Sequence, residues 1–312
     1  MYLITGAAGA VGGVSRTVVE LLLEKGEQVR GMVHRDDVRA DRLRELGADV
    51  VVGDLTRPVD VVAAMDGVTR MFFNMGVSLD YLQATAVVCA AALDHGGLEV
   101  LVNMSQMTVS QMTLASTEES RQQRLHWLSE QIINWSGAPV THIRPTVYLD
   151  NPLFTLLDRR SVGERGVLAL PFGTGRTSPI AAADVARVVT TVLQDPAHRV
   201  GKVYELTGPR VLDIAGLAEE YSRALKRPIT AEDIPYDEWL RHHLRPSGLP
   251  DHVQQHIATM ARLHREDRYN RATDDVERII GEPARTVGQY IASHPDLFVS
   301  RAPTADMPGT SS

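Results

Sequence analysis

The chain has 312 residues, of which 44% are hydrophobic and 23% charged, a composition that excludes a disordered protein and suits one large α/β unit with an attached lobe. Its 32 Lys and Arg against 39 Asp and Glu give a net charge of −7, which argues against a nucleic-acid or membrane partner and favours a small molecule. The single cysteine, Cys89, excludes an intrachain disulfide and a multi-cysteine zinc site. With no signal-peptide pattern and no 18-residue apolar segment, the expected location is cytoplasmic.

Apolar runs alternate with helical patterns along the first half of the chain. Strands separated by helices pair in parallel through right-handed crossovers, because a tight hairpin cannot reach a parallel neighbour. The pattern therefore predicts an α/β fold, with a Rossmann-like doubly wound parallel sheet and a smaller, mostly helical C-terminal substrate lobe. Strands are predicted over 1–5, 28–34, 49–52, 70–74, 98–103, 140–143 and 202–206, and helices over 14–25, 38–46, 59–65, 81–93, 120–135 and 184–193.

The regular alternation weakens after the sixth predicted strand, and this change predicts the domain organisation. We predict a dinucleotide-binding domain over 1–151, to which residues 181–208 return. Residues 152–180 and 209–298 are predicted to form the substrate lobe. Residues 299–312 are rich in Pro, Ser and Thr without apolar periodicity, and are predicted to be a disordered tail.

A glycine-rich turn joins the first predicted strand to the first predicted helix. A pyrophosphate can contact a helix N-terminus only where the backbone comes close to it, and glycine permits that approach. The turn therefore predicts a dinucleotide site, with a tight turn that binds nothing as the alternative. The predicted contacts are Thr5, Gly6, Gly9, Ala10, Val11 and Gly12.

The end of the second strand, His34-Arg35-Asp36, bears on the type of nucleotide. A carboxylate there would accept a hydrogen bond from the ribose 2′-hydroxyl, whereas a guanidinium would pair with a 2′-phosphate. Arg35, next to His34, favours NADPH over NADH. Asp36 and Asp37 keep NADH open, and a solvated surface charge is the alternative for Arg35.

Two later strand ends should face the same ligand, because open α/β sheets bind at the carboxyl ends of their strands. Asp54 and Leu55 follow the third strand, where a carboxylate can reach the adenine amino group. Asn74, Met75 and Gly76 follow the fourth strand on the adenosine and ribose side. Ordinary loop chemistry is the alternative for both segments.

A fourth segment, Trp135 to Thr146, reads as helix, Ser-Gly-x-Pro turn, strand and Arg-Pro. Together with the glycine turn, the strand end at Arg35 and Gly53-Asp54-Leu55, it makes the chain resemble the NmrA-like family of atypical short-chain dehydrogenases/reductases over most of residues 1–295. That family includes NADPH-dependent quinone reductases and redox-sensor proteins. The resemblance implies that the nicotinamide is lined by Pro145, Thr146 and Val147.

Ketoreductases of the wider superfamily use a Tyr and a Lys four residues later as a proton relay. The corresponding helix here has no such pair, and His126 lies nearest the lysine position. The resemblance implies that Ser105 polarises the substrate, while His126 is a candidate ribose contact or proton relay and Tyr148 a candidate hydroxyl donor. The alternatives are a local cap for Ser105, an exposed helical pair of His126 with Glu130, and core packing for Tyr148.

The predicted substrate pocket is lined by Gln106, Met107, Tyr148 and Asn151. No metal site is predicted, because the adjacent pair His242-His243 cannot share a metal as an i,i+4 pair would.

The leading hypothesis for function is an NADPH-dependent reductase of a ketone or quinone in a fairly large, apolar molecule. A quinone needs little acid catalysis, because the hydroquinone anion is delocalised, and this fits the missing Tyr/Lys pair. The alternatives are a non-catalytic NADP(H) sensor that regulates a protein partner, and an isomerase or cyclase in which the cofactor is structural. The sequence does not predict an oligomeric state or name the substrate.

Overall fold

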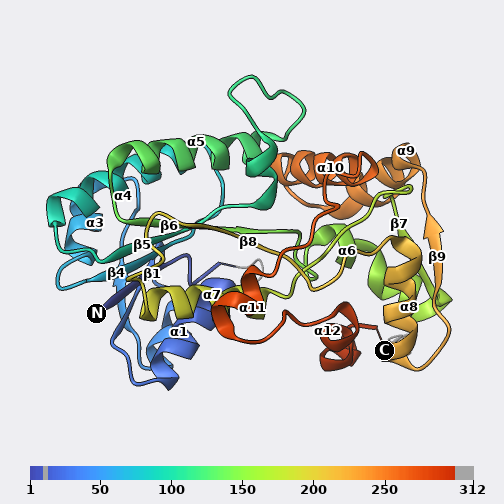
Figure 1. Cartoon of the computed structure of the whole chain (residues 1–312), viewed down its shortest axis with the longest axis horizontal. Coiled ribbons are helices and arrows are strands. Elements are labelled where there is room, and N and C mark those ends of the chain that lie inside the picture. Colours follow the sequence, from blue (N-terminus) through green and yellow to red (C-terminus); the bar gives the residue numbers. More distant parts are fainter. Residues whose placement is uncertain (10–12, 299–312) are drawn as a thin grey trace, which may run out of the picture.

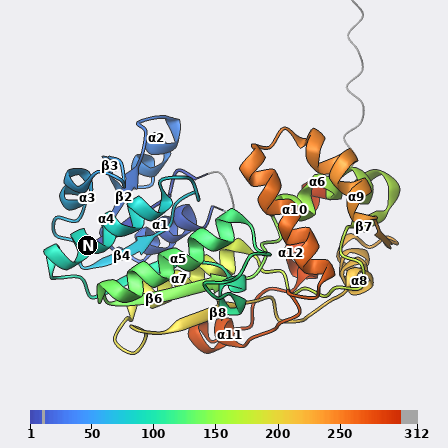
Figure 2. The same ribbon diagram turned by 90° about the horizontal axis from the view of Figure 1, so that it is seen from above.

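The computed structural model describes residues 1–9 and 13–298 and shows a large sheet covered by helices beside a smaller lobe (Figures 1 and 2). Three predicted cofactor contacts, Ala10, Val11 and Gly12, lie outside the described residues, as does the predicted tail 299–312.

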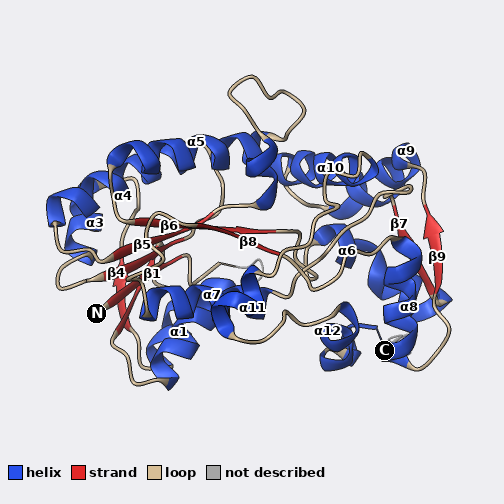
Figure 3. Cartoon of the chain, viewed as in Figure 1, coloured by secondary structure: helices blue, strands red, loops and turns tan. Residues whose placement is uncertain are grey.

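The large part is a seven-stranded parallel sheet in the order β3-β2-β1-β4-β5-β6-β8. Figure 3 shows its strands in red between two layers of blue helices. The chain runs outward from β1 to β3 and then returns to the other side of β1, so the strand order reverses between β1 and β4. Such a switch point is where doubly wound sheets bind ligands. The strands are β1 (Tyr2–Thr5), β2 (Val29–Val33), β3 (Asp49–Val52), β4 (Arg70–Phe73), β5 (Val100–Met104), β6 (Val140–Pro145) and β8 (Val203–Leu206).

Helices cover both faces of this sheet, which explains why its central strands are apolar on both sides. Adjacent residues alternate between the two cores: Leu3 packs with one set of helices and Ile4 with the other. Figure 1 shows α3, α4 and α5 above the sheet and α1, α7 and α11 below it. The bounds are α1 (Val14–Glu24), α2 (Val38–Glu45), α3 (Pro58–Ala64), α4 (Tyr81–His95), α5 (Arg121–Ser136), α7 (Ala182–Gln194) and α11 (Asp275–Ile280).

The smaller lobe has its own apolar core, which includes Phe154, Leu168 and Trp239. It contains a two-stranded parallel sheet that the sequence did not predict, formed by β7 (Val167–Leu170) and β9 (Thr230–Asp233). Every residue of β9 is exposed, so the strand lacks the apolar alternation that reveals a strand in sequence. The helices are α6 (Pro152–Leu157), α8 (Ile214–Leu225), α9 (Tyr236–Trp239), α10 (Asp251–Arg265) and α12 (Val287–Ser293), with short helical turns η1 (Met107–Gln111), η2 (Asp158–Arg165), η3 (Leu240–Leu244), η4 (Arg245–Ser247) and η5 (Pro295–Phe298).

One part of the predicted lobe packs on the sheet instead. Val276 on α11 and Ala284 just after it belong to the same apolar core as Ile4 and Val185. The predicted division at residues 151, 181 and 208 otherwise stays a prediction. Within the described residues, no helix is both long and apolar enough to span a membrane.

Candidate functional site

The glycine turn is held by contacts between the ends of β1 and β4. The Thr5 hydroxyl donates to the carbonyl of Asn74 at 2.8 Å and accepts from the backbone N–H of Asn74 at 2.9 Å. Gly6 has a positive φ of 73°, and a Cβ at this position would overlap the Asn74 carbonyl oxygen. Only glycine satisfies both conditions. Thr5, predicted as a cofactor contact, is fully buried and lines neither of the two cavities described below. Its side chain instead joins the end of β1 to the end of β4.

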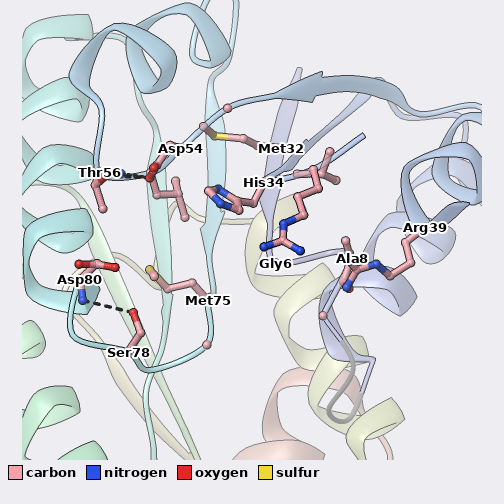
Figure 4. A pocket seen from close by; sticks show the side chains of 16 residues that line it. Gly6, Ala8, Met32, His34, Arg39, Asp54, Thr56, Met75, Ser78 and Asp80 are labelled. Atoms are coloured by element: carbon pink, nitrogen blue, oxygen red, sulfur yellow. Dashed lines mark hydrogen bonds between the residues drawn. The ribbon is translucent and has the colours of Figure 1, made fainter. Parts of the chain in front are cut away.

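The first cavity, of about 490 Å³, lies at the carboxyl ends of β1 to β4, and Figure 4 shows its lining. Because charged side chains from several loops face it, we name it the charged cavity. Asp54 and Asp80 lie on one side of it and Arg39 on the other (Figure 4). Eight of the predicted cofactor contacts line it: Gly6, Gly9, His34, Arg35, Asp54, Leu55, Met75 and Gly76.

The two aspartates that follow β2 already form ion pairs. Asp36 pairs with Arg44 at 2.7 Å, and Asp37 pairs with Arg39 at 2.5 Å while it caps α2. Hydrogen bonds from Arg39 lower the pKa of Asp37 to about 2. Within the described residues, no carboxylate forms an ion pair with Arg35, so its guanidinium stays available to a ligand anion in the charged cavity.

Asp54 is fixed by the turn that follows β3. One oxygen of its carboxylate accepts from both the backbone N–H and the hydroxyl of Thr56, each at 2.8 Å. These hydrogen bonds lower the pKa of Asp54, so the group is an ionised acceptor at neutral pH.

The second cavity, of about 530 Å³, adjoins the first, and both are lined by Gly6, Gly9, Met75, Gly76 and Ser78. Its walls come from the ends of β5 and β6, from the start of α5 and from one face of α10. No Asp, Glu, Lys or Arg is present among the described residues that line it, so we name it the uncharged cavity. Of the predicted site residues it is lined by Asn74, Ser105, Gln106, His126, Pro145, Thr146, Val147, Tyr148 and Asn151.

Three polar atoms in the wall of the uncharged cavity have no hydrogen-bond partner among the described residues. They are the hydroxyl oxygens of Ser105 and Thr146 and the amide nitrogen of Gln106. Leaving such an atom buried and unpaired costs about 1–3 kcal/mol, so these atoms indicate a site that a polar ligand completes.

The predicted exposed pair of His126 and Glu130 is wrong, because Glu130 is only 1% exposed and belongs to another pair. Arg144 on β6 donates two hydrogen bonds to its carboxylate, at 2.9 and 2.5 Å. Burial raises the pKa of Glu130, but the hydrogen bonds from Arg144 together with the charges nearby outweigh it and lower the pKa. The charge of Glu130 is thus neutralised by Arg144, and neither side chain lines the uncharged cavity.

His126 instead makes a hydrogen bond of 3.1 Å from its Nδ1 to the phenol of Tyr81. Burial lowers the pKa of His126 to about 4, so the imidazole is neutral at neutral pH.

Tyr148 donates to the sulfur of Met104 at 3.6 Å, and burial raises its pKa. Met107 is 1% exposed in the core of the lobe and does not line the cavity, because its side chain joins the apolar cluster there.

Sequence reasoning missed the contribution of α10. His252, His256 and Met260 recur at intervals of four residues, with Val253 and Ile257 beside them, and all five line the uncharged cavity. This i, i+4, i+8 spacing was visible in the sequence as a helix face, but nothing local indicates that the face meets α5. Tyr269 and Gln122 were missed for the same reason, and so was Arg39 in the charged cavity.

The sheet order and the glycine turn define a Rossmann-like nucleotide-binding protein. Residues 9–196 match a family model described as NAD(P)H-binding, so the chain belongs to that family. This match confirms the prediction of a nicotinamide cofactor, and the fold that the NmrA-like resemblance implied is shared by the solved structure of NmrA.

Two curated relatives span nearly the whole chain. An NAD(P)H azoreductase of Xenophilus azovorans is 27% identical over 300 residues, 96% of this chain and 99% of the relative. A (4-alkanoyl-5-oxo-2,5-dihydrofuran-3-yl)methyl phosphate reductase of Streptomyces griseus is 28% identical over 298 residues, 96% of this chain and 99% of the relative.

Two solved structures show the same fold. The NADPH-dependent quinone oxidoreductase QOR2 of Escherichia coli, complexed with NADPH, has a TM-score of 0.80 at 22% identity, covering 95% of this chain and 100% of the other. NmrA, a negative transcriptional regulator in complex with NADP, has a TM-score of 0.76 at 16% identity, covering 93% and 94%.

Proposed function

We propose that the chain is an NADPH-dependent reductase of a neutral, fairly large and mostly apolar ketone or quinone. The observation that carries this proposal is the uncharged cavity beside the glycine turn, in which Ser105, Gln106 and Thr146 present unpaired polar atoms. Neutral donors in an apolar wall suit a carbonyl oxygen, since an ionic substrate would lose its hydration without gaining a counter-charge. The azo and quinone reductases among the similar proteins support this reaction class.

The residues of the charged cavity fit the cofactor. The backbone at Gly6 and Gly9 would approach the pyrophosphate, Arg35 would pair with a 2′-phosphate, and Asp54 would accept from the adenine amino group. Asp36 and Asp37, the groups that would favour NADH, are held by Arg44 and Arg39. When bound, NADPH supplies a hydride.

The chain's own residues then bind and polarise the substrate. Ser105 donates a hydrogen bond to the carbonyl oxygen, and Pro145, Thr146 and Val147 line the nicotinamide side of the cavity. His126 and Tyr148 lie in the same wall, and both keep neutral forms at neutral pH. The proton comes from one of these side chains, from water, or from a hydroxyl of the substrate, which is sufficient for a delocalised hydroquinone anion.

The test is NADPH consumption by the purified protein across a panel of quinones and polycyclic aromatic ketones, with product and NADP⁺ measured together. We expect consumption that depends on substrate, with one NADPH oxidised for each molecule of ketone or quinone reduced. Ser105→Ala should lower kcat about tenfold and leave the Kd for NADPH unchanged. Ser293→Ala, at an exposed serine of α12, is the control. A complete absence of substrate-dependent consumption would contradict the proposal.

A non-catalytic sensor is the alternative that the NmrA fold suggests. The missing Tyr/Lys pair favours it, but a sensor does not need a cavity of about 530 Å³ with unpaired donors beside the cofactor. Equal affinity for NADPH and NADP⁺, no turnover and a cofactor-dependent protein complex would favour the sensor. Conversion of a substrate without net NADPH consumption would favour an isomerase or cyclase.

A further inference from the structure

Two histidines from adjacent helices line the uncharged cavity. His126 lies on α5 and His256 on α10, and both line the cavity. Figure 1 shows the start of α5 next to α10, although the two helices are far apart in the sequence. The junction is a hydrogen bond of 2.8 Å between Ser120, the N-cap of α5, and Nδ1 of His256.

The environment of Ser120 assigns the tautomer of His256. The Ser120 hydroxyl oxygen already accepts the backbone N–H of Gln123 in the capping box of α5. The hydroxyl hydrogen needs an acceptor as well, and among the described residues Nδ1 of His256, at 2.8 Å, is the one within reach. With Nδ1 accepting, a neutral imidazole carries its hydrogen on Nε2.

The environment of Tyr81 assigns His126 in the same way. Burial raises the pKa of the Tyr81 phenol, so it keeps its hydrogen. Its oxygen lies 3.1 Å from Nδ1 of His126, while the Ser129 hydroxyl, the other side chain that interacts with it, is hydrogen-bonded to Thr85 at 3.0 Å. We therefore assign the phenol hydrogen to Nδ1 of His126. His126 therefore also presents an N–H at Nε2.

Neither Nε2 has a hydrogen-bond partner within the described residues. Both rings are neutral at neutral pH: burial lowers the pKa of His126 to about 4, and burial together with the neighbouring His126 lowers that of His256 to about 3. The two rings are thus close enough for a charge on one to affect the other. They form two fixed donors in a cavity wall without Asp, Glu, Lys or Arg among its described residues.

We propose that the Nε2–H groups of His126 and His256 form a two-imidazole donor site that binds the substrate oxygen on which negative charge develops during reduction. This inference rests on the proposed reductase function and adds His256 to its site as a catalytic residue. For a ketone, the carbonyl carbon receives the hydride, the π electrons of the C=O bond move to oxygen, and the oxygen later takes a proton from solvent. For a quinone, the hydride reaches one carbonyl oxygen, the displaced π electrons move through the ring to the opposite oxygen, and that oxygen later takes the proton. The donors stabilise the oxyanion in place of the missing Tyr/Lys pair.

The site can be tested without turnover by binding 4-nitrophenol to the complex of the full chain with NADP⁺. The phenol and phenolate forms differ in absorbance, so a pH titration of the bound probe gives its apparent pKa. Two N–H donors favour the phenolate, and we expect the bound probe to ionise at least one pH unit below the free probe. His256→Leu should remove most of this shift, and His256→Gln, which keeps an N–H donor, should retain part of it.

Gln255→Leu, at an exposed position of α10 outside the cavity lining, is the matched control and should keep the shift. Bound NADP⁺ shows that each variant is folded. In steady-state kinetics with a quinone, His256→Leu should lower kcat about 100-fold without changing the Kd for NADPH.

These measurements separate this inference from the proposed function. A shift that depends on His256 in a protein that reduces nothing in the panel would support the donor site while the reductase proposal fails. Active reduction by a protein that shows no shift, or a shift that survives both His126→Leu and His256→Leu, would overturn the donor site while the reductase proposal stands.

Discussion

The two cavities lie at the same edge of the sheet but differ in the charge of the residues that line them. The charged cavity is lined by Arg35, Arg39, Asp54 and Asp80, whereas the uncharged cavity has no Asp, Glu, Lys or Arg among its described lining residues. The first takes most of its walls from loops that directly follow strands. The second combines such strand ends with faces of α5 and α10, two helices that are far apart in the sequence. A cofactor with phosphates and a neutral substrate can therefore bind side by side, each in a suitable electrostatic environment.

The largest effect should come from the glycine that both cavities share. Gly6→Ala places a Cβ against the Asn74 carbonyl at a positive φ, and we expect NADPH binding to weaken at least 100-fold in a fluorescence titration. Gly67→Ala is the control, because Gly67 has a similar φ of 70° but open space around it. Equal losses in the two variants would show that backbone strain alone, and not the close approach at Gly6, limits binding.

A second change tests the ion pair of Glu130 and Arg144. Glu130→Ala removes the closer partner of the half-buried Arg144 guanidinium and leaves it only Glu205 at 3.8 Å, so we expect the free energy of unfolding to fall by about 3 kcal/mol in urea. Glu45→Ala on the exposed face of α2 should change it by less than about 0.5 kcal/mol. A loss at Glu130 no larger than this control would contradict the view that the pair is a buried, mutually dependent unit.

The neutral histidines also predict how stability depends on pH. His264 is fully buried between the rings of Phe172 and Tyr269, and burial lowers its pKa to about 3. As pH falls below about 6.5 the unfolded chain binds a proton that the folded chain does not, so stability present above that pH is lost toward pH 3.

From pH 7 to pH 5 this one group should cost about 2 kcal/mol of unfolding free energy. In His264→Phe the acid-induced loss should be smaller by that amount, whereas in His198→Phe, at an exposed histidine, it should be unchanged. An equal pH dependence in wild type and His264→Phe, measured by urea unfolding, would refute the assignment.

The smallest effect concerns the cofactor preference set by the charged cavity. Arg35→Ala should weaken NADPH binding about tenfold and leave NADH binding nearly unchanged, because only the 2′-phosphate is lost as a partner. Arg42→Ala on α2, which does not line the cavity, should alter neither affinity. A parallel loss for both nucleotides in Arg35→Ala would mean that this arginine does not select between them.

The charged cavity was more accessible to sequence reasoning than the uncharged one. Arg35, Asp54 and Gly76 line the charged cavity as predicted, because each follows a strand whose position the apolar pattern indicates. The same rule places Ser105 and Thr146 in the uncharged cavity. It fails for Thr5, whose side chain is used to join β1 to β4, and for Met107, which packs in the lobe.

The sequence by itself determined the order of strands and helices of the large sheet, the glycine turn and the nucleotide edge, because these depend on local periodicity and on residues adjacent in the chain. Only the tertiary structure decided which partner each buried polar group has. Ser120 meets His256 across 136 residues, and Glu130 pairs with Arg144 instead of His126. Such pairings follow from how separate helices pack, and no local pattern records which faces will meet.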